Sequence, residues 1–135
     1  MGGYALIESN LRAIEERICA ACARSGRRRD EVRLVAVCKK QPLELIQDYL
    51  DAASSSGQPI ILAENYVQDL KAHRPALHGS FATHLIGPLQ SNKVREAVAS
   101  FDMIESVQNE KIARLINSES ERLGRVMAIL LQVNI

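Results

Sequence analysis

Residues 33–42 read RLVAVCKKQP, an apolar run that ends in two lysines and a proline. Successive side chains of an extended segment point to opposite faces, so Val37 and Lys39 share one face and Lys40 lies on the other. A short run that is apolar on both faces is typical of a buried strand in a parallel sheet, and Pro42 suits the first turn of a following helix. This stretch therefore predicts the first strand of an α/β fold, with a lysine at its carboxyl end.

The alternation of apolar runs and helical spacings extends over the whole chain. A leading helix precedes the first strand, because apolar residues recur at steps of three and four from residue 4 to residue 24. Helical spacings also fill each connection between strands, and Gly124 suits the end of the last helix. The leading helix places Ile7, Leu11, Ile14, Ile18 and Ala21 on one stripe, and the expected strands are 34–38, 60–63, 83–86, 103–107 and 128–133. The order indicates a parallel sheet covered by helices.

Two architectures fit this order of elements. A complete flavodoxin-like sandwich suits five parallel strands in 135 residues, whereas a (β/α)₈ barrel typically needs about 250 residues. The sequence stops at LLQVNI, directly after an apolar strand, and doubly wound proteins usually avoid such a bare final strand. We therefore expect a single domain, 1–135, that is the N-terminal portion of a TIM-type barrel truncated after about five strands. Residues 1–30 form its leading helix and connection, and residues 31–135 form strands one to five with the intervening helices.

Composition points to no electrostatic partner. The formal net charge is +1, and binding to nucleic acid or to an acidic membrane usually requires a basic excess. The sequence has neither a membrane-length apolar run nor the order of a signal peptide, so we expect a cytoplasmic protein that binds neither nucleic acid nor membrane. Cys19 and Cys22 form a C-x-x-C pair. Because no second pair of ligands accompanies them, they are expected to be small apolar residues of the leading helix, and no metal site is predicted.

Lys39 is the residue for which a chemical role is easiest to argue. Ligands of α/β folds gather at the carboxyl ends of the strands, where Lys39 lies. An amine buried there against apolar neighbours would be favoured in its neutral form, which attacks aldehydes to give Schiff bases. The simpler interpretation, that Lys39 and Lys40 both extend into solvent, stays open on this motif alone.

Four strings, one of them within residues 33–42, resemble one known family. LVAVCKKQP, AENYVQDL, HLIGPLQSNKV and IESVQNEKIA occur in this order, each near the end of an expected strand, and the last strand reads LLQVN. Together they resemble the N-terminal part of the pyridoxal phosphate homeostasis protein family, which is related to the N-terminal domain of alanine racemase. The resemblance spans nearly the whole chain.

The resemblance implies pyridoxal 5′-phosphate (PLP) as cofactor, held as an internal aldimine by Lys39 in a barrel with a leading helix. It implies an intracellular role in PLP (vitamin B6) homeostasis, possible delivery of PLP to apo-enzymes, and no established catalysis, so no catalytic residue is expected. Asn65 would lie close to the cofactor, although it could instead cap the helix that begins near Tyr66. His84 and Ile86 share a strand face beneath or beside the ring, with Val37 on the lysine face; His84 is more simply explained as a hydrogen-bonded interior histidine.

Two other functions stay open at this point. A PLP-dependent amino-acid racemase or decarboxylase of the same barrel type would need a second acid/base residue on the opposite face of the ring. A flavodoxin-like small-molecule or signalling domain would want acidic residues at the ends of its first and third strands, where this chain has Cys38-Lys39 and Gly87-Pro88. A five-stranded piece of a barrel would also leave residues 34–38 and 128–133 without a lateral neighbour. The chain is therefore expected to need a complementing fragment, to self-associate through those edges, or to rearrange into an open sheet.

Overall fold

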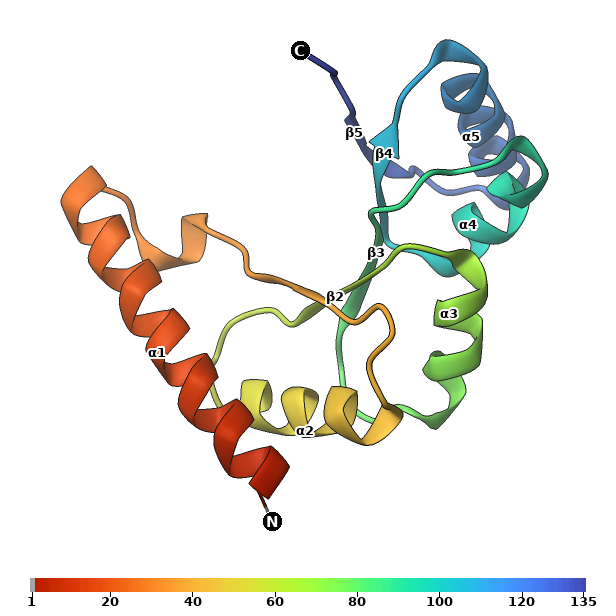
Figure 1. Ribbon diagram of the computed structural model, residues 1–135. Coiled ribbons are helices and arrows are strands. Elements are labelled where there is room, and N and C mark those ends of the chain that lie inside the picture. The colour runs from red at the N-terminus through yellow and green to blue at the C-terminus, as the bar shows by residue number, and fades with distance from the viewer. Residues whose placement is uncertain (1) are drawn as a thin grey trace.

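The computed structural model describes residues 2–135, which form one five-stranded sheet and five α-helices (Figure 1). The leading helix is confirmed, and every expected strand is present within one or two residues at each end. The helices are α1 (Gly2–Ser25), α2 (Leu43–Ser54), α3 (Val67–His73), α4 (Val94–Ser100) and α5 (Glu110–Leu123), with single 3₁₀ turns at Arg29–Glu31, Arg74–Ala76 and Ser91–Lys93. The strands are β1 (Val35–Val37), β2 (Ile61–Glu64), β3 (Ala82–Leu85), β4 (Met103–Val107) and β5 (Ala128–Leu131).

The strands are all parallel and lie in the order β1-β2-β3-β4-β5. A flavodoxin-like sheet has the order 2-1-3-4-5, in which the chain doubles back from its first strand. The flavodoxin-like alternative is therefore wrong. In the observed sheet each strand pairs with the strand before it in sequence, which is also how successive strands pair in a (β/α)₈ barrel.

The helices that connect the strands follow one another along one side of the sheet (Figure 1). Connections between neighbouring parallel strands are right-handed, so a sheet built in sequential order receives all of its connecting helices on the same face. Two clusters of apolar side chains fill the space between that face and the helices. The larger lies under α3, α4 and α5 and includes Leu85, Val98, Phe101 and Ile104; the smaller lies under α2 and includes Cys38, Ile46, Leu50 and Leu62. The opposite face of the sheet carries no helix among residues 2–135.

The leading helix α1 packs against α2 through Leu11, Ala52 and Ala53. The predicted stripe of α1 is only partly buried: Leu11 is buried, whereas Ile14 and Ala21 are exposed. α1 is the longest helix, but no helix within residues 2–135 is both long and apolar enough to cross a membrane.

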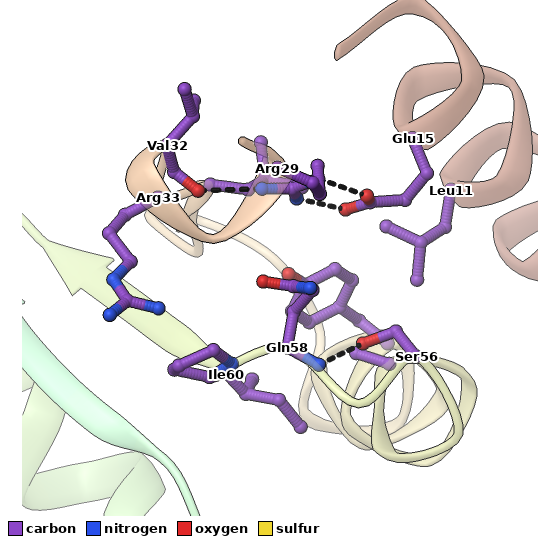
Figure 2. A pocket seen from close by; sticks show the side chains of 12 residues that line it. Leu11, Glu15, Arg29, Val32, Arg33, Ser56, Gln58 and Ile60 are labelled. Atoms are coloured by element: carbon purple, nitrogen blue, oxygen red, sulfur yellow. Dashed lines mark hydrogen bonds and ion pairs between the residues drawn. The ribbon is translucent and has the colours of Figure 1, made fainter. Parts of the chain in front are cut away.

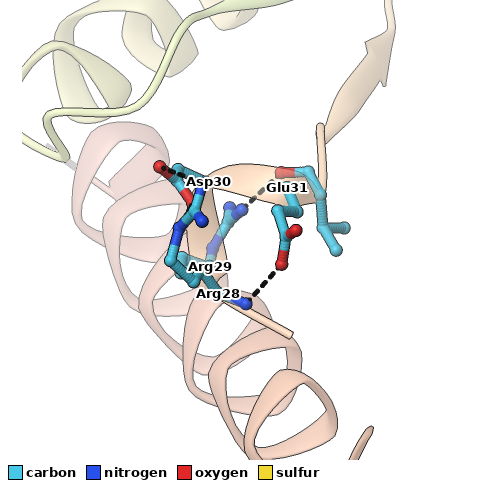
Figure 3. A network of polar contacts seen from close by, with 5 residues as sticks. Arg28, Arg29, Asp30 and Glu31 are labelled. Carbon is cyan, nitrogen blue, oxygen red and sulfur yellow. Dashed lines mark hydrogen bonds and ion pairs between the residues drawn. The ribbon is translucent and has the colours of Figure 1, made fainter. Parts of the chain in front are cut away.

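A pair of charged side chains fixes the connection between α1 and β1. Arg29 donates from Nε and Nη2 to the two carboxylate oxygens of Glu15, each at 2.7 Å, and from Nη1 to the carbonyl of Val32 at 2.6 Å (Figure 2). The cavity beside this pair measures about 10 Å³, which leaves room for about one water molecule and no organic ligand. Figure 3 shows the neighbouring contacts, in which Arg28 bonds to Asp30 and its backbone N–H donates to Glu31. These contacts explain the arginine-rich connection as structural.

Candidate functional site

The face of the sheet opposite the helices brings together most of the predicted site residues. Strand pairing aligns Val37 with Ala63, Ala63 with His84, and His84 with Met103. Their neighbours along each strand, such as Leu62 and Leu85, belong to the apolar clusters under the helices, so this row lies on the helix-free face. Val37 and His84, predicted to lie near one ligand, are thus two strands apart in a single row.

The next row toward the carboxyl ends of the strands contains the remaining predicted residues. Asn65 and Ile86 follow β2 and β3 directly, and Ile86 continues the ladder by donating its N–H to the carbonyl of Glu64 at 3.0 Å. The same register places Glu105 of β4 beside Ile86. Lys39 follows Val37 by two residues at the end of β1. The structure therefore gathers Lys39, Asn65, Ile86 and Glu105 at the carboxyl ends of the strands.

Lys39 lies in a tight turn at the end of β1. The N–H of Gln41 donates to the carbonyl of Cys38 at 3.0 Å, and Lys40 takes a left-handed backbone conformation with φ of 58°. Lys39 is exposed, so the prediction that its amine is buried against apolar neighbours is wrong for this chain. The physical reason is that β1 pairs only with β2 within residues 2–135, and Val37 is itself 48% exposed.

Asn65 is half-buried, and the alternative role proposed for it is wrong. The residue that precedes α3 as its N-cap is Tyr66, and no side chain within residues 2–135 caps this helix. The backbone of Asn65 instead packs against Gly87, just beyond β3: a Cβ atom on Gly87 would lie 2.1 Å from the carbonyl oxygen of Asn65. Ser106 of β4 donates from Oγ to the carbonyl of Gly87 at 2.5 Å. Asn65, Gly87 and Ser106 thus join the ends of three strands.

His84 forms a close pair with Glu105. Nδ1 of His84 lies 2.6 Å from Oε1 of Glu105, and the two side chains are 12% and 24% exposed. His84 is hydrogen-bonded and mostly buried, as the simpler interpretation predicts, and its place beside a cofactor stays a prediction. Glu105 was missed by sequence reasoning, as were Gly87 and Ser106. The alternation of side chains along 103–107 places Glu105 on the same face as Met103, which could have indicated Glu105. A glycine at a strand end could have suggested close backbone contact at Gly87.

A second histidine–carboxylate pair lies on the helix-covered face. Glu64 of β2 is 3% exposed and bonds through Oε1 to Nδ1 of His73 at 3.1 Å, while its Oε2 has no hydrogen-bond partner within residues 2–135. Burial raises the pKa of Glu64, and the bond to His73 opposes this shift. Burial, with a smaller contribution from the charge of Glu64, also raises the pKa of Cys38 to about 12. Cys38 therefore stays a thiol at neutral pH and is not suited to nucleophilic attack.

An apolar groove lies beside the predicted site, whereas a metal site is not found in the described part of the chain. No group of three or more histidine, cysteine, aspartate or glutamate side chains is arranged to hold a metal ion among residues 2–135. An apolar groove of about 180 Å³ runs beside β1 and is lined by residues of α1, β1, α2 and the turn after β1, among them Val37, Gln41 and Leu45. It adjoins the turn that carries Lys39. The carboxyl ends of the strands, where Lys39 lies, are therefore the best candidate site.

Comparison with known proteins identifies relatives of this chain, although no family model matches it. The pyridoxal phosphate homeostasis protein of Vibrio cholerae is 35% identical over 95% of the chain and 54% of the relative, and that of Escherichia coli is 32% identical over 96% and 55%. The chain thus spans about half the length of the curated relatives it matches.

Solved structures give the same result. PipY of Synechococcus elongatus, in a structure with PLP bound, matches with a TM-score of 0.72 and 36% identity, covering 90% of this chain and 55% of PipY. A protein of unknown function from Bifidobacterium adolescentis matches with a TM-score of 0.83 and 28% identity over 98% of this chain and 56% of its own. The chain is therefore a homologue, over about half of their length, of the pyridoxal phosphate homeostasis protein family.

Proposed function

We propose that this chain binds PLP through a Schiff base at Lys39 and serves PLP homeostasis in the cytoplasm without catalysing a reaction. The observation that carries the proposal is the match of 90% of the chain to PLP-bound PipY at 36% identity. The names of the curated relatives support a homeostatic role over an enzymatic one. Delivery of PLP to apo-enzymes follows from the same proposal.

The residues at this edge of the sheet suit the aldehyde end of PLP. When bound, PLP supplies an aldehyde that condenses with a primary amine. Lys39 offers that amine, and its exposure leaves it accessible. Asn65 offers an amide that both donates and accepts hydrogen bonds, and Val37 offers an apolar surface in the neighbouring row of the sheet. Ile86, half-buried on the neighbouring strand end, would limit the access of water.

We further propose that the five strands are part of an eight-stranded barrel. The sequential order of the strands supports this, as does the fact that the chain spans about half of its relatives. In β5, the side chains of Ile129, Leu130 and Leu131 are exposed, the last by 70%, which is unusual for an apolar strand. β1 and β5 are open edges, so this chain alone is expected to associate with a second copy or with a complementing fragment. Light scattering that finds only monomer would contradict this expectation.

The test of the proposed function is an adduct experiment with matched variants. The purified chain is mixed with PLP, reduced with borohydride and analysed by mass spectrometry of its peptides, beside Lys39→Ala and Lys40→Ala. We expect a single dominant adduct on Lys39 and a visible absorption band, both lost in Lys39→Ala and kept in Lys40→Ala. Equal labelling of the two neighbouring lysines would mean surface chemistry and would refute the assignment.

A catalytic role is tested with the same proteins. Assays for conversion between L- and D-alanine and for release of carbon dioxide from amino acids are expected to show no turnover above that of free PLP. Turnover that requires Lys39 would instead support a PLP-dependent racemase or decarboxylase.

A further inference from the structure

The carboxyl ends of β2, β3 and β4 are joined by a chain of contacts that the proposed function does not use. Backbone pairing of β3 with β4 ends at Leu85 and Ile104. Two residues further along each strand, the hydroxyl of Ser106 donates to the carbonyl of Gly87 at 2.5 Å, and both residues are buried. This hydroxyl therefore continues the link between the two strands at the end of the sheet where the candidate site lies.

An irregularity in β4 accompanies the position of Ser106. Ile104 pairs with Ile129 of β5 and Val107 pairs with Leu131, so β4 advances three residues where β5 advances two. Such a bulge changes the direction of the side chains beside it, and bulges are common next to functional sites for this reason. Ser106 lies within the bulge, is 2% exposed, and bonds toward β3, on the side of β4 opposite β5.

The contact continues from β3 to β2 through the backbone of Gly87. A Cβ atom on Gly87 would lie 2.1 Å from the carbonyl oxygen of Asn65 and 2.8 Å from its Cα, so the backbones of the two residues are in direct contact. Gly87 is thus held by a hydrogen bond from Ser106 and by close packing against Asn65. A shift of Gly87 must be shared by Asn65, because packed backbone atoms cannot rotate out of the way as a side chain can.

Asn65 is the residue at the end of this chain that can meet a ligand. It follows Ala63 by two residues, and Ala63 belongs to the row on the helix-free face. Its side chain is half-buried and does not cap α3, so its amide is available to donate or accept hydrogen bonds. A polar group recognises a ligand well when supporting contacts hold its position.

We infer that Ser106 is a positioning residue, which holds Gly87, and through it the backbone of Asn65, so that the Asn65 amide is directed at bound PLP. This inference rests on the proposed function and adds to it the contacts that prepare the site. Ser106 is itself buried, so it acts through Asn65.

The chain of contacts is tested first without ligand, by NMR of the labelled chain. In Ser106→Ala we expect the carbonyl ¹³C signal of Gly87 to move, because it loses a hydrogen bond, and the backbone N–H signal of Asn65 to move with it. Ser120→Ala is the matched control: Ser120 is also buried, at 6% exposure, and its hydroxyl donates to the carbonyl of Ile116 at 2.7 Å within α5. Signals of Gly87 and Asn65 should stay in place in the control. An Asn65 signal that also stays in place in Ser106→Ala overturns the inference.

Affinity for PLP is then measured by equilibrium dialysis in a double-mutant cycle. We expect Asn65→Ala to bind PLP about tenfold more weakly, as for the loss of one hydrogen bond, and Ser106→Ala about threefold more weakly, because the amide is displaced rather than removed. The double variant should bind like Asn65→Ala alone, since Ser106 acts through that amide. Ser120→Ala should bind like the wild type.

The outcomes separate the two proposals. A Lys39 adduct in the wild type, together with losses of affinity that multiply in the double variant, overturns the inference alone. Absence of a Lys39 adduct in the wild type overturns the proposed function, and the role of Ser106 with it. A loss in Ser106→Ala that disappears once Asn65 is alanine supports the inference, because a merely structural serine would weaken binding equally in both backgrounds.

Discussion

Replacing Gly87 by alanine tests the close packing at the carboxyl edge of the sheet. The added Cβ would lie 2.1 Å from the carbonyl oxygen of Asn65 and 2.8 Å from its carbonyl carbon, whereas ordinary contact begins near 3.4 Å. The atoms in the way belong to the backbone, so no side chain can rotate to relieve the overlap. The strand ends of β2 and β3 must therefore separate by about 1 Å or more.

The cost follows from what holds these two strand ends together. The carbonyl of Gly87 accepts the hydroxyl of Ser106 at 2.5 Å, and Ile86 donates to the carbonyl of Glu64 at 3.0 Å. Overpacking costs typically about 1–3 kcal/mol, and loss of one of these hydrogen bonds adds about 1 kcal/mol. We expect the free energy of unfolding to fall by about 3 kcal/mol, which lowers the melting temperature of a domain of this size by about 10 °C.

Thermal unfolding followed by circular dichroism measures this effect. The matched control is Gly124→Ala at the end of α5, where φ is +63° and nothing lies within 4 Å of the added Cβ. Its cost is purely conformational, about 1 kcal/mol. A melting temperature for Gly87→Ala as high as that of Gly124→Ala would refute the reasoning, because close approach would then carry no penalty.

Three further predictions concern stability elsewhere in the chain. Burial raises the pKa of Glu64, so ionisation of Glu64 opposes folding. The stability that protonated Glu64 contributes is fully present below its pKa in the unfolded chain and is lost as the pH rises through its pKa in the folded chain. Urea unfolding at a series of pH values should therefore show Glu64→Gln gaining stability over the wild type above about pH 4.5, and a constant difference would contradict this. Lys40→Gly should stabilise the turn by up to about 1 kcal/mol in the same assay, because φ of 58° suits glycine, and a destabilised variant would show that the lysine is not strained. Asn109 accepts the N–H of Ile112 at 2.9 Å as N-cap of α5, so Asn109→Ala should cost about 1 kcal/mol, whereas no change in the urea midpoint would deny the cap a role.

The number and order of the elements could be predicted from the sequence because each is encoded locally. Residues 34–38 are apolar on both faces, a pattern typical of strands in parallel sheets, and Gly124 ends α5 in the left-handed conformation expected of a terminal glycine. From the sequence, chain length favoured a flavodoxin-like sandwich, whereas the final apolar strand favoured part of a barrel. Strand order settles this choice, and strand order is a property of long-range pairing.

The burial and contacts of the site residues could not be predicted, because they depend on partners far along the chain. Lys39 is exposed because β1 pairs, in the part of the chain that the structure describes, with β2 alone, a fact that residues 33–42 do not contain. Ile14 is exposed because α1 packs against α2 mainly through Leu11. The pairing of His84 with Glu105 needs the register of β3 against β4, which no local pattern specifies. The candidate site was thus identified by residue type, while its contacts came from the sheet.

The sequential order of the strands also bears on how this protein forms during synthesis. Each strand pairs with the one made just before it, and the helix between them covers that same pair. Contacts therefore close over one βα unit at a time, so each loop to be closed is short and its entropic cost is small. The chain can be ordered progressively from its N-terminus as it leaves the ribosome, with each completed unit presenting the edge on which the next one assembles.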